Sequence, residues 1–165
     1  MPELPEVETT RRGLAPLLEG RGLAGAVVRQ PRLPWPVPAD LDEWVRGRRI
    51  ARVDRRGKYL LLGLAPDGGV VCHLGMSGSL RVLPADTPPH AHDHVDLLLD
   101  DGTALRLRDP RRFGALLTTA GPPKAHPRLQ GLGPEPLGPD LDADYLAGRA
   151  AGRRLAVKGF LMDAG

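Results

Sequence analysis

The chain has 165 residues, of which 41% are hydrophobic and 26% are charged, a balance typical of a globular protein. Its 21 glycines and 18 prolines lie between apolar segments rather than in a repeat, which excludes a low-complexity chain. No segment has the length of a membrane span and the start lacks the features of a signal peptide, so we expect a cytoplasmic protein without a membrane partner. The single cysteine, Cys72, excludes an intramolecular disulfide and a cysteine-based zinc site.

Arginine is the dominant basic residue, and it recurs in short blocks along a chain of formal net charge +3. Planar guanidinium groups suit bidentate phosphate contacts, so the blocks favour a nucleic-acid partner. A GC-rich coding sequence also raises arginine content, and composition alone therefore leaves both explanations open.

Residues 5–18 are predicted to form a helix. Pro5 suits the first helical turn, and Glu6 and Glu8 follow where the helix dipole is positive. Apolar residues recur near one face, and two glycines after residue 18 end the pattern.

Strand signals dominate the middle of the chain. They cover residues 25–30, 49–64, 68–83, 94–109 and 114–119. The proline-rich stretch 31–40 cannot occupy a central strand, and the pair Asp101–Gly102 between alternating segments predicts a hairpin. We therefore expect a mainly β fold, a two-layer antiparallel β-sandwich with the N-terminal helix packed against it.

The composition changes after the last strand. Residues 122–139 indicate a linker rich in proline and glycine, and residues 140–163 are predicted to form one amphipathic helix capped by Asp140 or Asp142. A single helix has nothing of its own to pack on. We therefore expect two domains, a β-sandwich at 1–135 and the start of a helical domain at 136–165.

The first residues carry chemistry of their own. If Met1 is removed, the terminus becomes the secondary amine of Pro2, and an α-amino group has a pKa of about 8, against about 10.4 for lysine. An unprotonated amine can attack a sugar carbon and form a Schiff base. Glu3 lies beside it and can serve as general acid or base, although alone it would be interpreted as a surface carboxylate.

Four segments together resemble one family. They are MPELPEVET, GKYLLL, HLGMSGSL with HDHVDL, and DPRRFG, and they occur in family order from residue 1 to about residue 163. The family is formamidopyrimidine-DNA glycosylase, the bacterial base-excision enzymes that remove oxidised purines such as 8-oxoguanine. The related endonuclease VIII begins Pro-Glu-Gly-Pro, whereas this chain has Pro-Glu-Leu-Pro.

The resemblance implies three catalytic residues. Pro2 would attack C1′ of the damaged nucleoside, and Glu3 would donate the proton that helps to expel the base. Lys58 would hold phosphate and donate a proton during strand cleavage. The implied activity is a bifunctional one, a glycosylase combined with an abasic-site lyase that acts by β/δ-elimination through a Schiff base. Without the resemblance, Lys58 would be interpreted as a solubilising charge at a strand edge.

The resemblance also implies a contact surface for damaged double-stranded DNA. An enzyme that extrudes a base must fill the gap, and Met76, Arg111 and Phe113 match the residues that do so in the family. The glycines around Met76 and Phe113 indicate loop tips rather than core positions. The remaining implied DNA contacts are His73, His92, Arg112, Arg153 and Lys158.

The segment HAHDH is the one candidate for a metal site. Its alternating His90, His92 and His94 would share one strand face, and two or three histidines can bind zinc. A histidine in a fold needs only a hydrogen-bond partner, however, and the resemblance assigns His92 to a DNA phosphate. We therefore expect no metal here.

The chain departs from the family at its C-terminal end. The family continues into the rest of a helix-two-turn-helix domain and a four-cysteine zinc finger, so the resemblance implies a C-terminally truncated member without a zinc cofactor. Gly159 also follows Lys158 where the family has proline. We expect a monomer with weakened duplex binding and impaired base excision, in which the uncovered C-terminal helix allows self-association.

Two alternatives to an active enzyme are open. The chain could be a non-catalytic DNA-binding remnant with the same fold, which borohydride trapping on abasic DNA would distinguish from an enzyme. It could also be a protein-interaction sandwich, whose binding would not depend steeply on salt.

Overall fold

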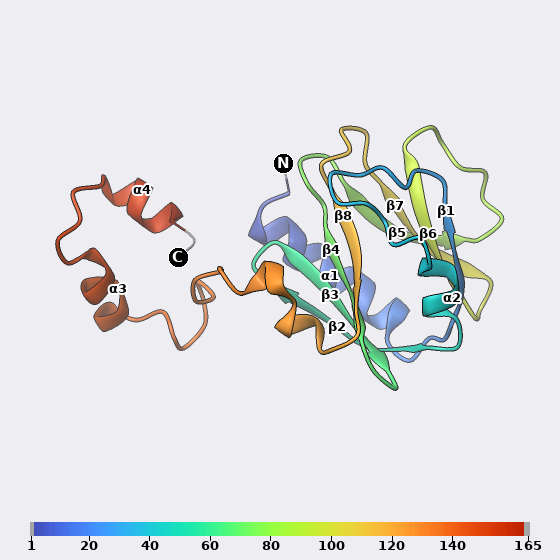
Figure 1. Ribbon diagram of the computed structural model, residues 1–165, viewed down its shortest axis with the longest axis horizontal. Coiled ribbons are helices and arrows are strands. Elements are labelled where there is room, and N and C mark those ends of the chain that lie inside the picture. The colour runs from blue at the N-terminus through green and yellow to red at the C-terminus, as the bar shows by residue number, and fades with distance from the viewer. Residues whose placement is uncertain (1, 164–165) are drawn as a thin grey trace. The chain divides into compact units, whose positions relative to one another are not determined.

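Eight strands pair into two antiparallel sheets of four strands in the computed structural model, which describes residues 2–163 (Figure 1). The strands are β1 (Leu23–Val28), β2 (Arg49–Arg56), β3 (Tyr59–Ala65), β4 (Gly69–His73), β5 (Ser79–Pro84), β6 (Asp93–Leu99), β7 (Thr103–Arg108) and β8 (Ala115–Thr119). One sheet has the order β1-β6-β7-β5 and the other β2-β3-β4-β8. The predicted two-layer sandwich is confirmed.

The core lies between the two sheets and contains aliphatic side chains almost exclusively. Leu60 and Leu62 on β3 and Leu97 and Leu107 on the other sheet are buried members of one apolar cluster. Strand alternation explains the pattern, since every second residue faces the partner sheet. The low aromatic content of 4% therefore does not prevent a dense core.

Helix α1 (Leu4–Leu18) closes one open side of the sandwich. It packs against β2 and β5, which are the edge strands of the two sheets, and it buries Val7, Leu14 and Leu18 in the shared core. The predicted helix is confirmed to within one residue. Helix α2 (Leu41–Val45), which sequence patterns did not predict, packs against β1 through the buried Leu41 and Val45.

The two β-like runs 49–64 and 68–83 each contain a turn and form two strands rather than one. The run 49–64 turns at Gly57–Lys58 to give β2 and β3, and the run 68–83 turns at residues 74–78 to give β4 and β5. The hairpin predicted around Asp101–Gly102 is present, with Gly102 at φ +82° between β6 and β7.

A buried ionic cluster lies on the side of β6 and β7 that faces away from the core. Asp96 accepts hydrogen bonds from Arg106 Nε and Nη2, both at 2.8 Å, and from Arg29 Nη2 at 2.8 Å. Arg106 also donates to the carbonyl of Thr87 at 3.0 Å. The cluster thereby fastens the long β5–β6 connection over the sheet.

The second compact unit begins at Pro127 and is described by itself. It follows the short helix η1 (Pro123–Ala125) and contains η2 (Pro127–Leu129), α3 (Ala143–Ala150) and α4 (Val157–Met162). The prediction of one helix over 140–163 is wrong because the chain leaves helical geometry after Ala150, where Gly152 adopts φ +74°. Of the two predicted cap residues, Asp142 is the one that caps α3, accepting from the Tyr145 amide at 2.8 Å. Within residues 2–163, none of the helices is both long and apolar enough to cross a bilayer.

Candidate active site

Pro2 and Glu3 precede the first turn of α1. Glu3 is the N-cap residue with an extended backbone, and its amide donates to Glu6 Oε2 at 3.1 Å while its carbonyl accepts from the Val7 amide at 3.0 Å. Val7 is buried, so the helix start is fixed to the core and the two preceding residues are held at its end. Met1, on whose removal the free amine of Pro2 depends, lies outside the described residues.

Lys58 lies in the turn between β2 and β3 and reaches the N-terminal segment. Its Nζ lies 2.5 Å from Glu3 Oε2, and both side chains are half-exposed. Gly57 adopts φ +56°, a conformation that favours glycine and lets the hairpin turn immediately before the lysine. The structure thus brings together the side chains of two of the three predicted catalytic residues, and the third is adjacent in the chain.

The carboxylate of Glu8, on α1, connects the helix with the turn that carries Lys58. Glu8 accepts hydrogen bonds from Arg11, Arg12 and Arg55, and the bond from Arg11 contributes most to lowering the pKa of Glu8 to about 2. Arg55 also donates to the Gly57 carbonyl at 2.9 Å. Helix α1 and the turn that carries Lys58 are therefore joined through one ionic cluster.

Two further loops lie at the same end of the second sheet as Lys58. The register pairs Tyr59 with His73 and His73 with Ala115, so the β2–β3 turn, the β4–β5 loop and the β7–β8 loop follow one another across that end. Figure 1 shows these two loops at the end of the sandwich where α1 begins. Three segments that are far apart in sequence therefore lie side by side there: the β2–β3 turn, the β4–β5 loop and the β7–β8 loop.

Met76 and Phe113 lie on the tips of these two loops. Their side chains are 38% and 50% exposed, so neither belongs to the core. The Arg111 guanidinium carbon lies 5.3 Å from the centroid of the Phe113 ring. The prediction that Met76 and Phe113 lie on loop tips is confirmed, and Arg112 beside them has φ +58°, a conformation rare for a residue with a Cβ.

The histidines do not share a strand face, so that prediction is wrong. His90 and His92 precede β6, whereas His94 is buried within it and its Nε2 lies 2.7 Å from the Asp109 carbonyl oxygen. His73 instead accepts from the Gly75 amide at 2.9 Å through Nδ1. Among residues 2–163, no three His, Cys, Asp or Glu side chains are grouped in a way that could hold a metal ion.

The last two predicted DNA contacts belong to the second unit. Arg153 pairs with Asp163 at 2.6 Å and its guanidinium carbon lies 5.8 Å from the centre of the Phe160 ring. Lys158 is exposed at the start of α4. Their roles stay predictions.

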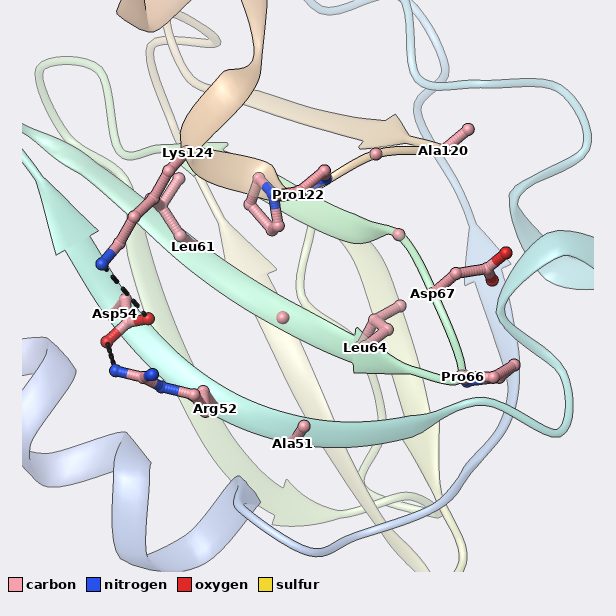
Figure 2. Close-up of a pocket in the computed structure, with 14 residues that line it drawn as sticks. Ala51, Arg52, Asp54, Leu61, Leu64, Pro66, Asp67, Ala120, Pro122 and Lys124 are labelled. Carbon is pink, nitrogen blue, oxygen red and sulfur yellow. Dashed lines mark hydrogen bonds and ion pairs between the residues drawn. The ribbon is translucent and has the colours of Figure 1, made fainter.

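A separate pocket of about 470 Å³ lies against β2, β3 and the 120–124 segment. Its lining is mainly apolar. Among its charged residues, Asp54 forms ion pairs with both Arg52 and Lys124 (Figure 2). The pocket shares no residue with the site described above, and the sequence patterns did not predict it.

Sequence motifs also missed the residues that support the site. Asp109 and Ser77 lie inside the recognised segments DPRRFG and HLGMSGSL, yet only their contacts distinguish them from other turn residues. Glu8 accepts a hydrogen bond from Arg55, which lies 47 residues away in the sequence, so no local motif predicts this pair.

Comparison with known proteins identifies the family. Residues 1–116 match the model of the formamidopyrimidine-DNA glycosylase N-terminal domain. The formamidopyrimidine-DNA glycosylases of Stenotrophomonas maltophilia and Laribacter hongkongensis are 60% and 56% identical over 99% of this chain, and in each case the chain spans 60% of the relative.

Solved structures agree in fold. The Lactococcus lactis enzyme, bound non-covalently to DNA containing an abasic site, superposes with a TM-score of 0.88 at 28% identity, covering 99% of this chain and 63% of its own. The Thermus thermophilus protein gives a TM-score of 0.79 at 39% identity over 99% of this chain and 57% of its own. The chain belongs to the formamidopyrimidine-DNA glycosylase family, and it spans about 60% of the length of the curated relatives it matches.

Proposed function

We propose that this chain carries the catalytic part of a base-excision DNA glycosylase that acts on oxidised purines in double-stranded DNA and also cleaves abasic sites. The observation that carries the proposal is the contact of 2.5 Å between Glu3 and Lys58 beside Pro2. The exposed apolar tips at the same end of the sheet support a DNA-contact surface. The Lactococcus lactis relative in complex with abasic-site DNA supports the same class of partner.

In the proposed reaction, the Pro2 amine attacks C1′ of the damaged nucleoside while the bond from C1′ to the base breaks. The base leaves with the proton that the attacking amine loses, and Glu3 donates its proton to the ring oxygen as the sugar opens. Loss of the ring oxygen from C1′ yields an iminium ion between Pro2 and the open sugar. Because Pro2 is a secondary amine, this ion carries a fixed positive charge and accepts electrons from the C2′–H bond.

The iminium ion then drives strand cleavage. Glu3, a carboxylate after its proton donation, takes the C2′ proton, and the electrons of the C2′–H bond form an enamine. These electrons then form the C2′=C3′ bond as the C3′–O bond breaks and the 3′-phosphate leaves in a β-elimination, which restores the iminium ion. In this proposal Lys58, which lies beside Glu3, binds a phosphate and returns a proton to a leaving oxygen. Water hydrolyses the iminium ion and regenerates the amine.

The remaining contacts have supporting roles in this proposal. Met76 and Phe113 enter the base stack when the target nucleotide is extruded, and Arg111 hydrogen-bonds the orphaned base. His73, His92, Arg112 and Arg153 bind phosphates, and Lys158 lies near the lesion. For the 165-residue polypeptide by itself, we expect cleavage of preformed abasic sites to exceed base excision, because an abasic site needs no base to be extruded.

Borohydride trapping tests the proposal. The chain, with Met1 removal verified by intact mass, is incubated with an abasic-site duplex and sodium borohydride, which reduces an iminium ion to a stable adduct. Peptide mapping is expected to place the adduct on Pro2, and Lys58→Ala is expected to leave trapping possible while slowing strand cleavage.

Two outcomes would contradict the enzymatic proposal. One is the absence of any adduct with the protein in excess, and the other is an adduct that Pro2→Gly leaves unchanged. Salt-sensitive DNA binding without an adduct would support the non-catalytic DNA-binding alternative instead.

A further inference from the structure

Asp109 is a fully buried carboxylate that connects the two loops carrying Met76 and Phe113. Its side chain accepts from the Ser77 hydroxyl at 2.8 Å and from the Gly114 amide at 2.7 Å. Within the described part of the chain its charge is met by these hydrogen bonds rather than by an ion pair. A buried carboxylate is costly unless its oxygens are hydrogen-bonded, so this geometry is strongly constrained.

The connection also includes Arg111, in the middle of the β7–β8 loop. Ser77 Oγ donates to Asp109 and accepts from the Arg111 amide at 3.0 Å. The Ser77 hydroxyl holds the Arg111 amide, and the Asp109 carboxylate holds the Gly114 amide. Because Ser77 also donates to Asp109, the residues on both sides of the Arg112–Phe113 pair are connected to Ser77, which follows Met76.

The backbones of the two loops also touch. A Cβ on Gly75 would lie 2.5 Å from the carbonyl carbon of Phe113, and Gly75 adopts φ +61°. A Cβ on Gly114 would lie 2.9 Å from Asp109 Oδ2. Asp109 is held in turn, because its amide donates to the His92 carbonyl at 3.0 Å.

We propose that Asp109 and Ser77 are positioning residues that join the Met76 loop and the Arg111–Phe113 loop into one rigid wedge. This inference rests on the proposed function and adds to it the residues that order the wedge before DNA arrives. Filling a gap in a base stack requires three side chains on two loops to enter together. If the loops moved independently, each would lose conformational freedom on binding, and that loss would weaken the complex.

The first test measures the link without DNA. Hydrogen exchange of the Arg111 and Gly114 amides is compared between the parent chain and Ser77→Ala, with Ser79→Ala on β5 as the matched control. We expect exchange at both amides to rise by about tenfold or more in Ser77→Ala, because the variant loses the hydrogen bond from Ser77 to Asp109 and the acceptor of the Arg111 amide. Unchanged exchange at both amides would overturn the inference whatever the protein does to DNA.

The second test measures wedge insertion. A duplex with a tetrahydrofuran abasic analogue and a neighbouring 2-aminopurine reports unstacking as a rise in fluorescence. At saturating protein we expect Ser77→Ala and Asp109→Asn to give a smaller rise than the parent, Ser77→Thr to restore it by keeping the hydroxyl, and Ser79→Ala to match the parent.

A double-variant cycle separates positioning from general destabilisation. In a Met76→Ala/Phe113→Ala background, adding Ser77→Ala is expected to cause no further loss of affinity, because there is no wedge left to position. An equal loss in both backgrounds, or a parent-like fluorescence rise in Ser77→Ala, would overturn the inference.

The failure of the proposed function would look different. If Met76→Ala/Phe113→Ala bound and unstacked the duplex as the parent does, the wedge itself would be refuted, and the exchange measurement would still decide whether Ser77 links the loops.

Discussion

Glu8→Gln is expected to destabilise the first unit in a way that depends on pH. Glu8 accepts hydrogen bonds from three arginines, and the bond from Arg11 makes the largest contribution to lowering its pKa from 4.5 to about 2. By linkage, a shift of this size corresponds to about 3 kcal/mol at neutral pH. The Glu8 side chain is 24% exposed and water screens its charge, so we expect about 2 kcal/mol.

The sign follows from the direction of the shift. Because the pKa of Glu8 is lower in the folded chain, its contribution is complete above about pH 4.5 and is lost as the pH falls toward about 2. Glutamine cannot titrate and accepts hydrogen bonds without charge. The difference in the free energy of unfolding between parent and variant should therefore be constant from pH 7 to about pH 5.5, and about two fifths of it should be gone at about pH 3.5.

Urea unfolding followed by far-ultraviolet circular dichroism, at several pH values, measures this difference. Glu43→Gln on α2 is the matched control, because Glu43 is exposed and has no ion pair among residues 2–163, and we expect it to change stability by less than about 0.5 kcal/mol. If Glu8→Gln lowered the free energy of unfolding by the same amount at pH 7 and pH 3.5, the shape of the Glu8 side chain rather than its charge would be responsible for its contribution. No deficit at pH 7 would refute the role of the cluster altogether.

Two further predictions concern a buried ion pair and a close contact between loops. Asp96→Ala should lower the free energy of unfolding by about 3 kcal/mol in urea titrations, since it leaves the 3%-exposed Arg106 without its bidentate partner; a loss below about 1 kcal/mol would contradict this. Gly75→Ala should lower the melting temperature, because its Cβ would strike the Phe113 backbone. The control is Gly13→Ala in α1, where a Cβ meets nothing within 4 Å, and it should raise the free energy of unfolding by about 0.5–1 kcal/mol. Equal effects of the two substitutions would refute the loop contact.

Sequence patterns predicted the elements whose signals are local. Helix α1 followed from Pro5 and an apolar face, and the hairpin between β6 and β7 followed from Asp101–Gly102. The errors occurred where the local signal was ambiguous. The run 140–163 had helical composition throughout, but Gly152 at φ +74° interrupts it, and glycine is tolerated in a helix often enough that its presence alone did not predict a break.

The histidines of HAHDH illustrate the same limit in the site. Alternation placed three rings on one face only if the strand began before His90, and β6 begins at Asp93 instead. The buried Asp93 ends the loop: its side chain accepts from the His90 amide at 2.8 Å and from Arg108 at 2.7 Å. Burial raises the pKa of Asp93, but these bonds outweigh it and lower the value to about 2. Loop structure here depends on an arginine on a neighbouring strand, which no local pattern contains.

The candidate site separates two kinds of information in the sequence. The roles predicted for Glu3, Lys58, Met76 and Phe113 came from motifs that resemble one family, because the acid and the cation by themselves would have been interpreted as surface charges. Their proximity came from the register, in which Tyr59, His73 and Ala115 lie side by side across one sheet. The residues that fix that proximity are polar side chains with ordinary turn composition, such as Ser77, whose importance lies in partners 32 and 34 positions away. Chemistry could therefore be predicted from motifs, whereas the rigidity that makes the chemistry effective depends on contacts that only the folded chain contains.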